Sequence, residues 1–96
     1  MPVSALVIDR KDNVATAVAQ LEKGTLVSVQ TGDSTVDVVL SQAIPFGHKF
    51  ALKEIEKASP IIKYGETIGS ATARIAKGEH VHVHNVEGLR GRGDKA

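Results

Sequence analysis

The hydrophobic pattern of the chain contains a four-residue motif that occurs four times. An aliphatic residue is followed by two other residues and then by a small one, at 21–24, 44–47, 55–58 and 75–78. Each copy precedes a segment of alternating or β-branched residues, which is typical of strands. We interpret each copy as a tight turn with a buried aliphatic side chain and a small residue whose φ can be positive.

The same pattern predicts strands at 25–29, 48–52, 61–64 and 79–85. Gly32-Asp33 lies between two apolar runs, so 25–40 is predicted to form one β-hairpin. The apolar residues of segment 14–21 fit both the spacing of a helix and the alternation of a strand, and their periodicity favours a helix. We therefore expect a mainly β fold in a single small domain over 1–86, with short helical turns. Residues 87–96 hold three glycines and no apolar period, and they are predicted to form a flexible tail.

Composition narrows the class of protein. With 96 residues there is room for one domain, and a formal net charge of +1 does not provide the basic surface that nucleic-acid binding needs. The absence of cysteine favours a reducing, cytoplasmic location. The N-terminus reaches Asp9 and Arg10 before any signal-length apolar segment, and no run of 18 apolar residues exists, so no membrane association is expected.

Three histidines near the C-terminus are the clearest candidates for chemistry. His80, His82 and His84 alternate with Val81 and Val83, so a strand would place all three imidazoles on one face. Neighbouring members would be ~6.5 Å apart and the outer pair ~13 Å apart, so at most two are expected to share one metal ion. The alternative is a solvated strand face on which the histidines are only polar.

Two further segments carry candidate site residues. His48 and Lys49 follow the 44–47 turn and place a titratable imidazole beside an ammonium group, although a lone histidine is often structural. Lys63-Tyr64-Gly65-Glu66 brings a cation, a phenol and a carboxylate to a strand end, or else forms a hydrogen-bonded turn capped by Tyr64. Neither a phosphate-binding glycine loop nor a nucleophilic cysteine is present, so covalent catalysis and nucleotide hydrolysis are unsupported.

Segments 47–52, 61–69 and 78–85 together resemble the N-terminal module of the altronate dehydratase family. The resemblance implies a SAF-type domain of β-clip architecture, and with it a strand rather than a helix at 14–19. It also implies a hydro-lyase component that takes part in removing water from altronate- or galactarate-type sugar acids. Members of this family generally use a divalent metal such as iron(II), which would be shared with a large subunit or domain. Residues 90–94 look like the connector to that domain.

Carried over to this sequence, the resemblance implies three groups of site residues. His48 and Lys49 would be catalytic, and His82 and His84 would bind metal, with His80 as a third candidate. The substrate would contact Lys63, Tyr64, Gly65, Glu66 and Asn85.

Two alternative functions stay open: a stand-alone sugar-acid-binding module, and the small subunit of a sulfolactate sulfo-lyase. The expected partners are a large dehydratase subunit and a small sugar acid, and edge strands make a homo-oligomer plausible.

Overall fold

The computed structural model describes residues 4–88, which form nine short strands and no helix in that range. The mainly β prediction is confirmed, whereas the expected short helical turns are not found among the described residues. The strands are β1 (Ala5–Leu6), β2 (Val14–Ala17), β3 (Leu26–Thr31), β4 (Ser34–Val39), β5 (Lys49–Ala51), β6 (Pro60–Lys63), β7 (Glu66–Ala71), β8 (His80–Val81) and β9 (Val86–Gly88).

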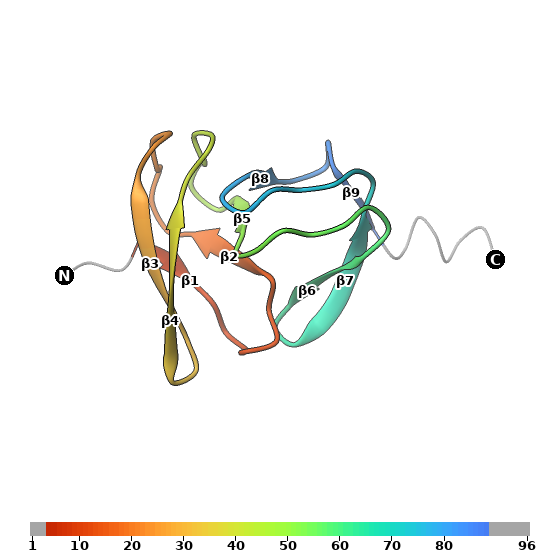
Figure 1. Cartoon of the computed structure of the whole chain (residues 1–96), viewed down its shortest axis with the longest axis horizontal. Helices are drawn as coiled ribbons and strands as arrows, with labels where there is room; N and C mark the ends of the chain where they lie inside the picture. Colours follow the sequence, from red (N-terminus) through yellow and green to blue (C-terminus); the bar gives the residue numbers. More distant parts are fainter. Residues whose placement is uncertain (1–3, 89–96) are drawn as a thin grey trace.

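A central four-stranded antiparallel sheet, in the order β1-β2-β5-β8, divides the molecule into two halves (Figure 1). The β3–β4 hairpin lies on one side, at the left of the view, and the β6-β7-β9 sheet lies on the other. Because successive side chains of a strand point to opposite faces, each face of the central sheet packs into a separate core.

The first core lies between the central sheet and the β3–β4 hairpin. Phe50, the largest fully buried side chain, packs there with Ala15 and Ala17 of β2 and with inward-facing valines of the hairpin. The hairpin pairs in register from Leu26↔Val39 to Thr31↔Ser34, which leaves Gly32 and Asp33 as a two-residue turn. The predicted 25–40 hairpin is therefore confirmed.

The second core lies between the opposite face of the central sheet and the β6-β7-β9 sheet. Val14, Ala51 and Val81 contribute from the central sheet, and Ile61 and Ala71 pack on them. Strands β6 and β7 are joined by Tyr64 and Gly65, both with positive φ (57° and 74°), as a type I′ hairpin turn requires.

The four repeated turns have the predicted form. Their aliphatic residues are all buried, and each small residue has a positive φ: Gly24 (87°), Gly47 (83°), Ala58 (73°) and Gly78 (86°). The turns also associate in pairs, because Leu21 and Ile44 exchange two backbone hydrogen bonds of 2.8 and 2.9 Å, and Ile55 and Ile75 exchange two of 2.8 Å. Two copies of one local structure thus face each other in each half of the molecule.

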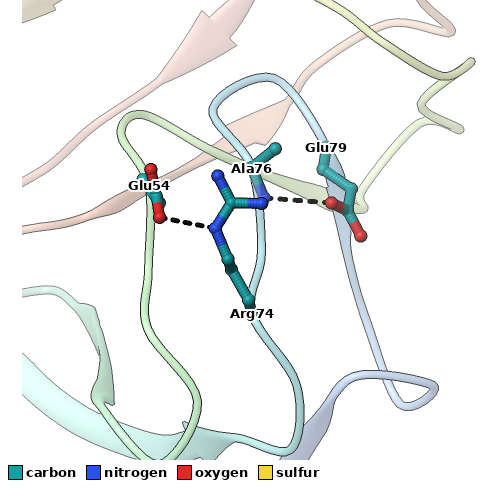
Figure 2. A network of polar contacts seen from close by, with 4 residues as sticks. All are labelled: Glu54, Arg74, Ala76 and Glu79. Atoms are coloured by element: carbon teal, nitrogen blue, oxygen red, sulfur yellow. Dashed lines mark hydrogen bonds and ion pairs between the residues drawn. The ribbon is translucent and has the colours of Figure 1, made fainter.

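An exposed ion pair and a side-chain cap reinforce the second pair of turns (Figure 2). Arg74 Nε contacts Glu54 Oε2 at 2.5 Å, and these two residues directly precede Ile75 and Ile55. This hydrogen bond lowers the pKa of Glu54 and raises the pKa of Arg74. Glu79 Oε1 accepts the backbone N–H of Ala76 at 3.0 Å, so the Glu79 carboxylate closes the 75–78 turn.

Two boundaries differ from the sequence-based predictions. The helical periodicity of 14–21 is misleading, since Val14–Ala17 forms strand β2, as the family resemblance implied. Val14, Ala15 and Ala17 are all buried because β2 lies between two cores, and a strand buried on both faces does not alternate. Glu87 and Gly88, assigned to the tail, belong to β9, and the rest of the predicted tail lies outside the described residues.

The repeated turn predicts unequal costs for one substitution at two equivalent glycines. A Cβ at Gly78 would collide with the carbonyl oxygen of Val39, whereas a Cβ at Gly24 would meet nothing within 4 Å, although both glycines have the same positive φ. Gly24→Ala should lower the free energy of unfolding by about 1–2 kcal/mol for the left-handed backbone alone. Gly78→Ala should cost about 1–3 kcal/mol more, because of the clash.

Urea unfolding of the two variants measures this difference. If both substitutions lowered the free energy of unfolding equally, this would contradict the close approach of the 75–78 turn to Val39.

Candidate functional site

The histidines meet because β5 and β8 begin directly after two of the repeated turns. Gly47 ends one turn and His48 follows it, while Gly78 ends another and His80 lies two residues on. The strands pair antiparallel with Lys49 opposite Val81 and Phe50 opposite His80, so the same register places His48 opposite His82. The imidazole rings of His48 and His82 accordingly stack, with centroids 4.1 Å apart and planes at 13°.

His80 joins this pair from the diagonal position. Its Nε2 lies 2.8 Å from Nδ1 of His48, which is hydrogen-bond distance, and its ring centroid lies 5.6 Å from that of His82. One ring nitrogen from each of His48, His80 and His82 can be chosen so that all three lie within 4.8 Å of one another. The structure therefore groups His80 and His82 with His48, which the sequence analysis had assigned to a separate catalytic pair.

The predicted strand 79–85 is wrong beyond Val81, because residues 82–85 form a turn. Val83, which a continued strand would place on the same face as Val81, is 82% exposed at this turn, whereas Val81 is buried. The turn also folds His84 back, so that its ring centroid is only 5.1 Å from that of His80, where a strand would have held the two ~13 Å apart. His84 is exposed and is not part of the group of three nitrogen donors.

Asn85 holds this turn in place. Its side-chain oxygen accepts the backbone N–H of His82 at 3.0 Å, and its side-chain amide donates to the carbonyl of His80 at 2.8 Å. Asn85 is only 4% exposed, so both ends of its amide are committed to the backbone between the histidines. This position makes Asn85 a support for His80 and His82, and its contact with the substrate stays a prediction.

The electrostatic surroundings favour neutral histidines. Partial burial lowers the pKa of His80, and the neighbouring histidines, with His84 first, lower it further when they are protonated. Desolvation likewise lowers the pKa of His82, followed by the charges of His48 and Lys49. A neutral imidazole can accept a proton or bind a metal ion, and a protonated one can do neither.

The remaining predicted site residues lie toward the other side of the central sheet. Lys49 is the register partner of Thr16 and Val81 and leaves β5 on the face opposite to His48. Lys63 ends β6, with its ammonium 4.7 Å above the centre of the Tyr64 ring, and Gly65 and the exposed Glu66 complete the same hairpin. Partial burial, and then the positive charge of Lys63, lower the pKa of Lys49.

Two buried residues that the sequence analysis did not assign to the site anchor this hairpin to β2. Asp12 accepts the backbone N–H of Gly65 at 2.8 Å. Asn13 accepts that of Ile62 at 2.8 Å and donates to the carbonyl of Pro60 at 2.9 Å. Within the residues themselves, a polar pair directly before an apolar segment indicates this role only weakly, because the same pattern is equally typical of a surface turn.

The lowered histidine pKa values predict that acid destabilises the fold. His80 and His82 have the ordinary value of about 6.5 when unfolded and lower values when folded. Between these values the unfolded chain binds more protons, so their contribution is fully present above about pH 6.5 and is lost as the pH falls below it.

The urea concentration at the midpoint of unfolding should therefore decrease as the pH is lowered from about 7.5 to about 5.5. The fall should be smaller in the variant His80→Asn/His82→Asn. A midpoint that rises on acidification, or an equal fall in the variant, would be inconsistent with this assignment.

Several known proteins are similar to this chain in sequence. It is 53% identical to altronate dehydratase from Escherichia coli over 74 residues, and this match covers 77% of this chain and 14% of the relative. It is 37% identical over 93 residues to (2R)-sulfolactate sulfo-lyase subunit alpha from Chromohalobacter salexigens, covering 94% of this chain and 99% of that subunit. Altronate dehydratase from Bacillus subtilis is 37% identical over 84 residues, covering 88% of this chain and 16% of the relative.

Membership of a family follows from the extent of these matches. The chain spans about one seventh of the length of the Escherichia coli altronate dehydratase, and nearly the whole length of the sulfo-lyase subunit. Residues 4–88 include no helix long and apolar enough to cross a membrane. The family model for the altronate/galactarate dehydratase SAF domain matches residues 3–89, and the chain therefore belongs to the SAF-domain family of altronate and galactarate dehydratases.

Proposed function

We propose that this SAF domain forms one wall of the active site of a sugar-acid dehydratase and that a larger domain or subunit completes the site. The observation that carries the proposal is the convergence of His48, His80 and His82 from two turns that lie far apart in the sequence. The high identity to an altronate dehydratase supports a sugar acid of the altronate or galactarate type as the substrate.

The proposed reaction is a β-elimination of water. A base removes the proton α to the carboxylate, the electron pair of that C–H bond forms a C=C bond, and the β-hydroxyl leaves with one added proton as water. The resulting enol then tautomerises to a 2-keto acid. His80 and His82 suit proton transfer at ring nitrogens that are not bound to a metal, because their lowered pKa values keep the imidazoles neutral near pH 7.

The donor set also fits a divalent metal. Three imidazole nitrogens within 4.8 Å of one another match the ligand type that iron(II), zinc and related ions accept. His48, His80 and His82 would hold the ion, with iron(II) as the proposed cofactor. A bound metal would supply a Lewis acid for the oxygens of the substrate.

A second candidate function is the alpha subunit of a sulfolactate sulfo-lyase. It is favoured by one observation, namely that the chain matches nearly the full length of such a subunit. The elimination would be the same, with sulfite in place of water as the product that leaves. In either case the large partner is part of the proposal, and a cytoplasmic location stays a prediction.

Metal binding should distinguish the three-histidine group from the pair His82–His84 expected from the sequence. We expect His48→Ala, His80→Ala and His82→Ala each to weaken Co²⁺ binding by about tenfold or more, since even the loss of a group that only supports a ligand costs that much. His84→Ala should leave the affinity unchanged, because His84 lies outside the group.

Isothermal titration with Co²⁺, checked by its visible absorption, measures these affinities. A loss in His84→Ala as large as that in His82→Ala, with His48→Ala unaffected, would favour the original pair.

Turnover is tested with the chain alone and then mixed with its candidate large subunit, in the presence of ferrous iron. Altronate, galactarate and sulfolactate are supplied separately, and the keto acid or sulfite is measured. Dehydration in the mixture alone, lost in His48→Ala or His82→Ala, is the expected result.

Sulfite release without dehydration would select the second candidate function. Ligand binding by the chain alone, with no turnover in the mixture, would replace the proposal with a stand-alone binding module.

A further inference from the structure

A small depression lies toward the side of the central sheet that the histidine cluster does not use. Its volume is about 80 Å³, and it lies between the first two strands and the β6–β7 turn. The residues that line it are Leu6, Ile8, Asp12, Val14, Thr16, Lys63 and Tyr64. Leu6, Ile8 and Tyr64 are 47%, 64% and 57% exposed, so an apolar surface is left open to solvent around it.

Two lysines stand beside this apolar surface. Lys63 is part of the lining, and Lys49 is the direct cross-strand neighbour of Thr16, on the same face of the sheet. The one ion pair between residues of the range 4–88 is Arg74–Glu54, so within that range neither lysine has a carboxylate within 4.0 Å. Glu66 is the cross-strand partner of Lys63, but within residues 4–88 it forms no ion pair with it. Two neighbouring ammonium groups that are not ion-paired in this range, next to an apolar surface, have the composition of a site for an anion with an apolar body.

Two of the nearby acidic side chains, Asp9 and Asp12, accept hydrogen bonds from the backbone. Asp12 accepts N–H groups from Ile8, Asp9 and Gly65 at 2.8–3.3 Å. Asp9 accepts the N–H of Lys11 at 2.8 Å. These bonds fix the depression and its turn, and they direct both carboxylates toward backbone N–H groups rather than into an ion pair with Lys49 or Lys63.

We propose that this depression is a binding site for a short aliphatic carboxylate, separate from the histidine cluster. The alkyl chain would lie on Leu6 and Val14, and the carboxylate would lie between Lys63 and Lys49. At about 30 Å³ per water, a volume of about 80 Å³ corresponds to roughly three waters, so the depression takes only a short ligand, part of which stays exposed to solvent. The site requires neither the metal nor the large partner of the proposed function.

The test is a titration of the ¹⁵N-labelled chain with sodium butyrate at constant ionic strength, followed by two-dimensional NMR. Saturable shifts are expected at Thr16, Lys63 and Tyr64, with a dissociation constant in roughly the millimolar range. Lys49→Gln and Lys63→Gln should each raise that constant about two- to five-fold, as expected for partly exposed ion pairs. Lys57→Gln, which removes an exposed lysine from the 55–58 turn, is the matched control and should have no effect.

Two further ligands test the proposed chemistry. Butyramide has the same alkyl chain without the charge and should bind more weakly than butyrate. Gluconate has the charge but a hydroxylated chain, and it should also bind more weakly, because Leu6 and Val14 offer it no hydrogen bonds. The proposal is overturned if butyrate gives no saturable shifts, if butyramide or gluconate binds as well as butyrate, or if Lys57→Gln weakens binding as much as Lys63→Gln. Because no metal, partner or turnover is involved, these results are independent of the dehydratase test.

Discussion

The paired aliphatic turns are the constraint on which the rest of the structure depends. In each pair, two buried side chains face each other and two backbone hydrogen bonds join their residues, as for Ile55 and Ile75. The small residue that ends each turn has a positive φ and donates its backbone N–H to another segment, as Gly47 does to Ala17 and Gly78 to Ala51. These bonds fix where β5 and β8 begin, and hence where His48 and His80 lie.

Local chemistry explains why part of the fold could be predicted from the sequence. The turns and the β3–β4 hairpin follow from residues close in sequence, such as Gly32 and the aliphatic residue of each turn. Strand β2 could not be predicted from its own pattern, because Val14 and Ala15 are buried by cores on opposite faces. The turn at 82–85 was missed because alternating His and Val favour a strand locally, whereas the buried Asn85 amide stabilises the turn through His80 and His82.

The candidate site, too, could be predicted from the local sequence pattern only in part. The sequence indicated the histidines but placed His48 in another group, since its approach to His82 depends on a register between strands about thirty residues apart. It also combined His48 with Lys49, although adjacent strand residues point to opposite faces. The structure thereby separates a histidine cluster suited to proton transfer or metal binding from a lysine-flanked apolar depression, with the central sheet between them.

The central claim is that the β5–β8 register brings His48 against His82. Nuclear Overhauser contacts between the imidazole protons of the isolated chain at neutral pH test it most directly, because such contacts require protons within about 5 Å and the ring centroids are 4.1 Å apart. Strong cross-peaks from the His48 ring to the rings of both His82 and His80 are the expected result. Cross-peaks confined to His80, His82 and His84, with none to His48, would contradict it.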